Sequence, residues 1–288
     1  MDSHTAREEL LRLVREADAS ANNGSVPFAA DRAALLIAVD EYPHLDLSIY
    51  EAQLDHYAER VSAALPRGAA ADDPRGRLAA MRRVLFEDEA FHGDRENYQD
   101  VRNSYLNEVL DRKLGIPISL GAVMLGVARR LSWPLAPVNF PGHFLLCYRG
   151  EGAALAVDPF HGGLILGRTD LVERWQATTR TPAPSPDLML RVADAASVVV
   201  RMLNNIWLVH AGAHRYQLAA LAKEKVALLE PHEPAHERDL GYLLAGAGNV
   251  DAAARRLRAY LDRAPCAPDR EQVRLHLARL GNYRFDHS

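Results

Sequence analysis

The chain contains 288 residues, of which 48% are hydrophobic and 25% charged, and its formal net charge is −4. These proportions are typical of a soluble globular protein with one large domain or two of ordinary size. No Lys/Arg stripe dominates any segment, which argues against nucleic-acid binding. No window approaches the roughly 18 consecutive apolar residues of a membrane span, and the N-terminus lacks a signal peptide's apolar region, so we expect a cytoplasmic protein.

The first 95 residues are predicted to be helical. Apolar residues recur at helical spacing in three successive segments, residues 7–17, 31–39 and 47–65. A loop rich in Gly, Ala, Asp and Pro follows at 66–76, and residues 78–86 show a further amphipathic pattern. We expect these helices to pack on the domain that follows them.

The segment after residue 101 predicts one buried helix and a small antiparallel sheet. Residues 105–114 form a helix that Gly115 and Pro117 end, and residues 119–131 form a second, very apolar helix. Four short strands are expected, at 135–140, 143–148, 153–157 and 164–166. Glycines at 150–152 indicate a hairpin turn between the second and third strands. A buried helix laid on an antiparallel sheet is an α+β layout.

A proline-rich segment at 179–187 marks the expected domain boundary. We therefore divide the chain into a domain over residues 1–182, with its N-terminal helical part, and an all-α region over 183–288.

The all-α region contains an internal repeat. Ala219 and Ala253 lie 34 residues apart, as do Pro231 and Pro265, and this is the tetratricopeptide period. Gly241, Ala253, Leu257 and Pro265 follow one another at spacings of 12, 4 and 8, which match the repeat's Gly, Ala, Phe and Pro positions. We expect two repeat units followed by a capping helix at 272–280.

Ser119, His143 and Asp158 form the chemistry-bearing set. They follow one another at separations of 24 and 15 residues, with Ser119 at the start of the apolar helix, His143 opening one strand and Asp158 closing the next. A nucleophile at a helix N-terminus, with a base and its orienting group on neighbouring strands, is the geometry of papain-like acyl transfer. The chain order is nucleophile, His, Asp.

The same region carries short motifs in a characteristic order: Asn-Ser-Tyr-Leu at 103–106, GIPISL at 115–120, PVNFPGHFLL at 137–146 and DPFHGG at 158–163. Together with the repeats that follow, they resemble the SirB-type transglutaminase-like family. The resemblance implies a transglutaminase-like or papain-like core fused to helical repeats. It also implies that His143 and Asp158 are the His and Asp of the triad, and that Ser119 stands near the position of the nucleophilic cysteine.

Serine in place of cysteine is a departure with chemical consequences. A thiol has a pKa of about 8.5 that is readily lowered, whereas a hydroxyl needs full help from a general base and an oxyanion hole. Ser119 is also an ordinary helix cap. His143 could be a hydrogen-bonded core histidine, and Asp158 before Pro159 could form a turn.

Two further ideas about the site are disfavoured by spacing. Cys147 lies four residues beyond His143 on the same strand, about 13 Å away, so it is expected to be a core residue rather than the nucleophile. A metal site is the other idea, since His143, Asp158 and His161 are close in sequence and His92 lies upstream. No two of these residues have the spacing of a typical ligand pair. We therefore expect no metal and no cofactor.

The polar motif residues could either cap helices or line the cleft, and the resemblance favours the cleft. These expected binding residues are Asn103, Ser104, Tyr105, Asn139 and Phe140.

Two functions follow. The first is a non-catalytic or weakly catalytic binding or regulatory protein that recognises a protein or peptide through its cleft and repeats. The alternative is an amide or ester hydrolase, or acyltransferase, with Ser119 as nucleophile, His143 as base and Asp158 as orienting group. We favour the binding protein, with no nucleic-acid or membrane partner.

Overall fold

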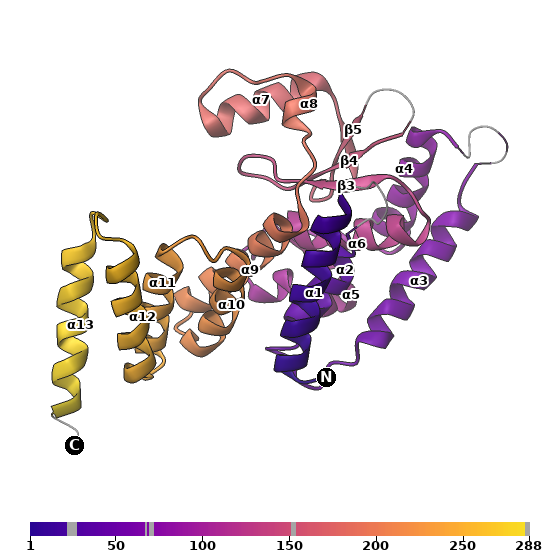
Figure 1. Ribbon diagram of the computed structural model, residues 1–288. Helices are drawn as coiled ribbons and strands as arrows, with labels where there is room; N and C mark the ends of the chain where they lie inside the picture. The colour runs from indigo at the N-terminus through magenta and orange to yellow at the C-terminus, as the bar shows by residue number, and fades with distance from the viewer. Residues whose placement is uncertain (22–27, 67, 69–71, 151–153, 286–288) are drawn as a thin grey trace. The chain divides into compact units, whose positions relative to one another are not determined.

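The structure, a computed structural model, describes residues 1–21, 28–66, 68, 72–150 and 154–285. Contacts divide the chain into two units, Met1–Met202 and Leu203–Ser288. The first unit combines helices with a small antiparallel sheet, and the helices of the second follow it along the chain (Figure 1). The predicted α+β class is confirmed. Within the described part of the chain, no helix combines the length and apolar character needed to cross a membrane.

Four helices precede the core: α1 (Ser3–Ala21), α2 (Ala30–Ala38), α3 (Leu47–Ala63) and α4 (Pro74–Arg82). Side-chain caps fix where two of them begin. The Asp46 carboxylate accepts the Ser48 N–H at the start of α3, and Asp73 accepts the Gly76 N–H at the start of α4. Helix α4 begins earlier than predicted because Pro74 suits the first helical position, and it continues into the π-helical turn Arg83–Asp88.

Helix α6 (Pro117–Arg130) is the centre of the first unit. All its residues from Pro117 to Ala128 are buried, and it packs against α2, α3 and α5 (Leu106–Arg112). The helix begins at Pro117 rather than at Ser119, since proline is pre-organised for the first helical position. The expectation that Ser119 opens the helix was wrong, and Ser119 is its third residue.

The sheet contains four antiparallel strands in chain order: β3 (Leu135–Val138), β4 (Leu145–Tyr148), β5 (Leu155–Asp158) and β6 (Leu164–Leu166). The first two are shorter than predicted, because Gly142 adopts a φ of 67° and turns the chain between them. His143 therefore lies in this turn and not in a strand. Residues 151–153 of the predicted hairpin turn and third strand lie outside the described residues.

Three short elements lie in the chain between α4 and α6. Strands β1 (His92–Gly93) and β2 (Leu114–Gly115) pair in parallel over two residues each, and a 3-10 turn spans Val101–Ser104. Such brief pairing leaves no periodic signal in the sequence.

Helices α7 (Arg168–Thr179) and α8 (Pro186–Met189) cover a face of the sheet. Met189 and Leu190 share a buried cluster with Leu145 of β4 and Leu171 of α7. This packing extends the first compact unit beyond the proline-rich segment to Met202, which lies inside α9 (Ala195–Gly212). The domain division expected at residue 182 stays a prediction.

The second unit contains α10 (Tyr216–Leu229), α11 (Ala235–Gly246), α12 (Val250–Arg263) and α13 (Arg270–Phe285). Consecutive helices pack in pairs. Gly241 explains one repeat position: a Cβ atom there would lie 2.5 Å from the Leu257 side chain, so only glycine permits the close contact of α11 with α12. The segment expected to cap the repeats, 272–280, lies within α13.

A buried ion cluster joins α2 to α6. The Asp31 carboxylate, 2% exposed, accepts hydrogen bonds from Arg130 at 2.6 Å and Arg129 at 3.1 Å. Burial alone would raise the pKa of Asp31, but the two guanidinium groups hold this pKa below its ordinary value. Gly126 permits the contact, since a Cβ there would lie 2.8 Å from the Asp31 side chain.

Replacing Asp31 tests this cluster. We expect Asp31→Asn to lower the free energy of unfolding by about 3 kcal/mol, because it leaves two partly buried arginines without a full counter-charge. Asp55, which pairs with Arg130 but is 63% exposed, is the matched control, and Asp55→Asn should cost under about 1 kcal/mol. Urea unfolding measures both, and equal losses would show that burial does not set the strength of this cluster.

Candidate functional site

One buried carboxylate organises the candidate site. Asp158 ends β5, and its side chain is 0% exposed. It accepts hydrogen bonds from His143 Nε2 at 2.9 Å and His161 Nδ1 at 2.7 Å, and Arg174 lies 3.2 Å away in an ion pair. The backbone N–H groups of Phe160 and His161 also donate to it, at 3.1 and 3.3 Å. Asp158 thus fixes both the imidazole of His143 and the turn that follows β5.

The same contacts determine the charge of Asp158. Burial would raise the pKa of this carboxyl, but hydrogen bonds and charges from His143 and His161 outweigh burial and lower the pKa to about 2. The group is therefore an anion at neutral pH.

The backbone around Asp158 requires glycines. Gly162 and Gly163 adopt φ values of 70° and 69°, and the Gly163 N–H donates to the Asp158 carbonyl at 2.9 Å. This left-handed turn returns the chain into β6 and leaves Phe160 and His161 at its tip. The DPFHGG motif therefore encodes a carboxylate and the turn that wraps around it.

Only one ring nitrogen of His143 makes a hydrogen bond within the described part of the chain. Its Nε2 bonds Asp158, while Nδ1 has no hydrogen-bond partner among the described residues. The Phe160 ring meets His143 edge-on at 6.5 Å between centroids and meets Tyr98 at 5.9 Å. Gly93 allows Phe160 to approach β1, because a Cβ atom there would lie 2.5 Å from that ring. The orientation of His143 is that of a base held by a carboxylate.

Ser119 is engaged elsewhere. Its side chain is buried, and its Oγ donates to the Asn103 carbonyl at 2.6 Å and accepts the Ile116 N–H at 3.0 Å. The hydroxyl therefore joins the start of α6 to the 3-10 turn before α5. The structure brings His143 and Asp158 together, and it gives Ser119 backbone partners instead of the imidazole.

Of the Asn-Ser-Tyr motif, Asn103 has the most polar contacts. It is buried, and its Nδ2 donates to Asp94 at 3.0 Å and to the Asn97 carbonyl at 2.9 Å. Ser104 is half-buried at the end of the 3-10 turn. Tyr105 is buried against the ring of Tyr42 at 5.5 Å, so it is a core residue.

A cavity of about 780 Å³ lies beside this network. Residues 92–97 line it together with Phe160 and His161, and its walls contain both acids and arginines. Asp94 connects the cavity to Asn103, and His161 connects it to Asp158. This cavity gives the His143–Asp158 pair a neighbouring space for a ligand.

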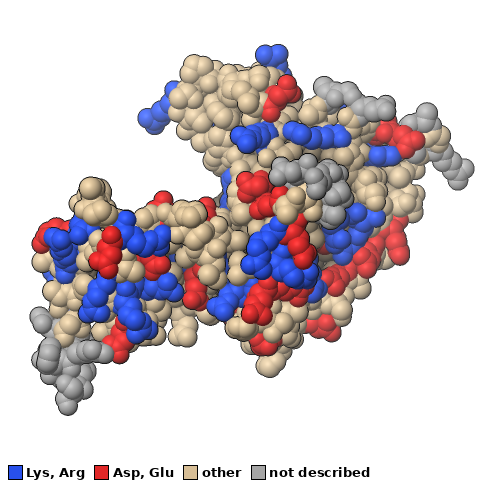
Figure 2. Space-filling view, viewed as in Figure 1, with Lys and Arg blue, Asp and Glu red and all other residues tan. Residues whose placement is uncertain are grey.

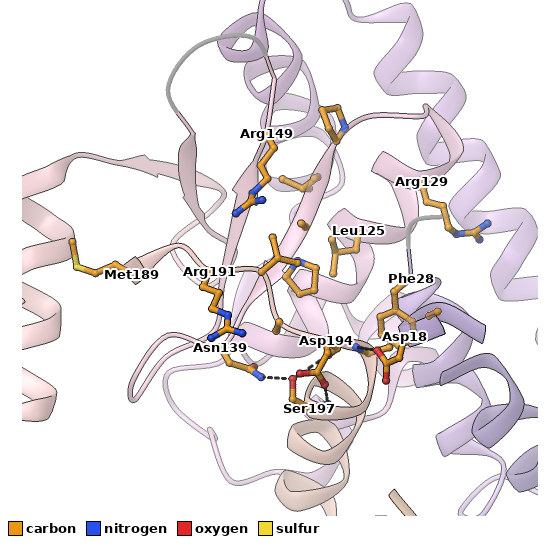
Figure 3. A pocket seen from close by; sticks show the side chains of 18 of the residues that line it. Asp18, Phe28, Leu125, Arg129, Asn139, Arg149, Met189, Arg191, Asp194 and Ser197 are labelled. Carbon is orange, nitrogen blue, oxygen red and sulfur yellow. Dashed lines mark hydrogen bonds between the residues drawn. The ribbon is translucent and has the colours of Figure 1, made fainter. Parts of the chain in front are cut away.

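A second, larger cavity of about 970 Å³ lies beside β3, with Arg149, Arg191 and Asn139 among its lining residues (Figure 3). Asn139 donates to Ser197 Oγ there at 3.1 Å. Phe140, by contrast, is buried against Trp175 at 5.7 Å between ring centroids. Asn139 and Phe140 were both predicted to line the cleft near Ser119. Asn139 instead lines this second cavity, and Phe140 belongs to the core.

Three side chains of the site could together hold a cation. Donor atoms of His143, Asp158 and His161 all lie within 4.8 Å of one another, and such a set suits Zn²⁺. The sequence argument against a metal rested on ligand spacing along the chain. The turn after β5 brings His161 close to His143 although the two residues lack that spacing. The Arg174 ion pair adds positive charge at the same carboxylate and opposes a bound cation.

Sequence reasoning considered His161 only as a disfavoured metal ligand. It missed Arg174, which pairs with Asp158, and Arg201, which donates to the Phe140 carbonyl at 3.4 Å. His161 lies inside a motif that had already been identified, so its proximity to Asp158 was the available signal. Arg174 and Arg201 come from helices α7 and α9, and nothing in their local sequence indicates a site.

Two family profiles and several known proteins match the sequence of this chain. A profile of the transglutaminase-like superfamily matches residues 49–204, and a tetratricopeptide-repeat profile matches residues 207–278. A UPF0162 protein of Xylella fastidiosa (strain Temecula1) is 34% identical over 281 residues, covering 96% of this chain and 98% of that protein. A UPF0162 protein of Vibrio cholerae is 26% identical over 246 residues, covering 84% and 86%.

A shorter similarity extends to a eukaryotic protein. F-box only protein 21 of Homo sapiens is 48% identical over 82 residues, which are 28% of this chain and 13% of that protein. No solved structure matches the chain significantly. Because the superfamily profile covers more than half of the sequence, the chain belongs to the transglutaminase-like superfamily and carries tetratricopeptide repeats after its core.

Proposed function

We propose that the chain is a non-catalytic or weakly catalytic binding protein of this superfamily. It recognises a protein or peptide through the cavity beside His143 and Asp158 and through its helical repeats. The observation that carries the proposal is the Ser119 hydroxyl, which donates its proton to the Asn103 carbonyl. We also propose the finer SirB-type assignment and a cytoplasmic location.

The position of Ser119 disfavours the alternative hydrolase. A serine nucleophile must give its proton to a base within hydrogen-bond reach, and here that proton is directed at a backbone carbonyl. Ser119 is also 3% exposed, so a substrate carbonyl has little access to it. The hydroxyl stabilises the start of α6 instead.

The cysteines offer no replacement. Cys147 is fully buried in the sheet, and burial raises the pKa of its thiol, which disfavours the reactive thiolate. Cys266 is exposed, but it lies in the repeat unit.

The repeats and the surface favour a protein partner. Tetratricopeptide arrays commonly present surfaces that bind peptides or helices. On the face shown in Figure 2, basic and acidic side chains lie interspersed, which suits mixed polar contacts with a protein better than a nucleic-acid backbone.

Active-site labelling tests the central claim. We expect no reaction of the full chain with a serine-reactive fluorophosphonate, because Ser119 is buried and bonded to the backbone. Ser119→Ala should instead lower the free energy of unfolding by about 1–3 kcal/mol, since it leaves the Ile116 N–H and the Asn103 carbonyl without their partner. Labelling that both Ser119→Ala and His143→Ala abolish would establish the hydrolase.

Peptide selection tests the binding role. Peptides selected by phage display on the full chain should lose at least about tenfold in affinity with Tyr98→Ala, since Tyr98 is 47% exposed and supports Phe160 at the cavity. Ile49→Ala, at an exposed site on α3, is the control and should bind normally. Equal affinities for both variants would place the binding surface elsewhere.

The pKa of Asp158 predicts a pH dependence of stability. Its value of about 2 in the folded protein lies below the ordinary value of 3.8, so ionised Asp158 stabilises the fold above pH 4. This contribution, about 2 kcal/mol, disappears as pH falls through about 2. Asp158→Asn should be less stable than wild type at pH 7, and the difference should shrink below pH 4. Urea unfolding from pH 7 to pH 2.5 measures it, and a constant difference would contradict an ionised Asp158.

A further inference from the structure

Arg201 is a half-buried cation without an anionic partner in the described part of the chain. It lies on α9, and its guanidinium carbon is 5.7 Å from the centre of the Phe144 ring. One of its nitrogens donates a long hydrogen bond, 3.4 Å, to the Phe140 carbonyl. Burial lowers the pKa of Arg201. At Asp31, by contrast, two arginines balance the buried carboxylate charge.

The position of Arg201 connects it to His143. The Phe140 carbonyl that receives Arg201 also accepts the His143 N–H at 3.0 Å, so both residues meet at one end of the same turn. Tyr98 approaches from another side: burial raises the pKa of its phenol, and the charge of Arg201 opposes that rise. Tyr98 contacts Phe160, which contacts His143. Arg201 is therefore linked to His143 through the turn at Phe140, and Tyr98 is linked to His143 through Phe160.

The chemistry of a guanidinium limits what could occupy this place. Arginine presents five N–H donors in a planar fork, and the two contacts described here leave most of them unused. A half-buried charge without a counter-ion is costly, and an anion from a ligand would remove that cost. The cavity that Phe160 lines already contains arginines beside its acids, so a ligand there meets mixed charges. A single carboxylate matches one fork with two parallel hydrogen bonds.

We propose that Arg201 is the residue that recognises an anion at the His143 site, and that this anion is a carboxylate of a bound peptide. The inference rests on the proposed peptide-binding function and specifies what the peptide must offer. The carboxylate comes either from the C-terminus of the peptide or from an Asp or Glu side chain. Because the Phe140 carbonyl accepts both Arg201 and the His143 backbone N–H, a ligand held by Arg201 should also perturb the environment of His143.

Small carboxylate probes separate the two sources. N-acetylglycylglycine carries a C-terminal carboxylate, N-acetylglutamylglycinamide carries only a side-chain carboxylate, and N-acetylglycylglycinamide is neutral. Each is titrated to tens of millimolar against the full chain, while NMR follows the imidazole signals of His143. We expect saturable shifts with one or both carboxylates and none with the neutral amide. The tighter carboxylate identifies the source.

Variants assign the binding to Arg201. Arg201→Gln should weaken the better probe by about tenfold to a hundredfold, as expected for loss of a charge-assisted hydrogen bond. Arg201→Lys keeps the charge but loses the fork, so its affinity should fall between wild type and Arg201→Gln. Arg168→Gln, at an exposed arginine of α7, is the matched control and should bind as wild type. Urea unfolding shows whether each variant is folded.

Three outcomes would overturn the inference: equal binding of neutral and charged probes, unchanged affinity in folded Arg201→Gln, or no shift of His143 with any probe. These outcomes are distinct from failure of the proposed function. Selected peptides that bind Arg201→Gln as tightly as wild type would leave the binding role intact and exclude Arg201. Fluorophosphonate labelling of Ser119 would overturn the binding role, while carboxylate-dependent shifts would still locate an anion site at Arg201.

Discussion

The buried carboxylate of Asp158 is the constraint on which the site depends. A charge with no solvent contact is tolerated only when donors surround it, and five groups from the β3–β4 turn, the β5–β6 turn and α7 converge on it. The two turns are short and irregular and have no strong conformational preference of their own, whereas α7 is a regular helix. Their shared acceptor places His143, Phe160 and His161 in a single arrangement, and the buried α6 packs against β3 and β4 of the same sheet.

The two polar centres of the first unit have different consequences for function. Around Asp158, the donors include side chains that remain partly accessible: His143 is 16% exposed and His161 32%. Around Ser119, the partners are backbone groups in the protein interior. Accessible imidazoles suit contact with a ligand, whereas a buried hydroxyl between two backbone segments suits stability. The first unit thus combines a partly accessible His–Asp pair with a buried serine that joins two backbone segments.

Much of the fold followed from sequence patterns, and the exceptions have physical causes. The helical N-terminal part, the buried α6, the antiparallel sheet and the repeats were all signalled by periodicity or spacing. The start of α6 was displaced because Pro117, not the polar Ser119, determines the first turn. His143 was assigned to a strand because its neighbours are apolar, but Gly142 bends the chain just before it. Met189 and Leu190 follow the proline-rich segment and still pack in the buried cluster of the sheet, a contact that no local sequence pattern indicates.

Only the site residues that lie within the short sequence motifs could be predicted from the sequence. The pairing of His143 with Asp158 was expected from the order of two short motifs, and His161 lay within one of them. Arg174 and Arg201 belong to amphipathic helices in which an arginine ordinarily faces solvent, so only the packing of α7 and α9 shows that they approach the site.

The contrast between the two cysteines also has a practical consequence. Cys147 is buried at 0% exposure in β4, whereas Cys266 is exposed between α12 and α13, and the sequence contains no other thiol. The natural sequence therefore provides a single attachment point for a fluorophore or spin label, located in the repeat unit and remote in sequence from the Asp158 network. Distances and motions of the repeats can then be followed without engineering the core.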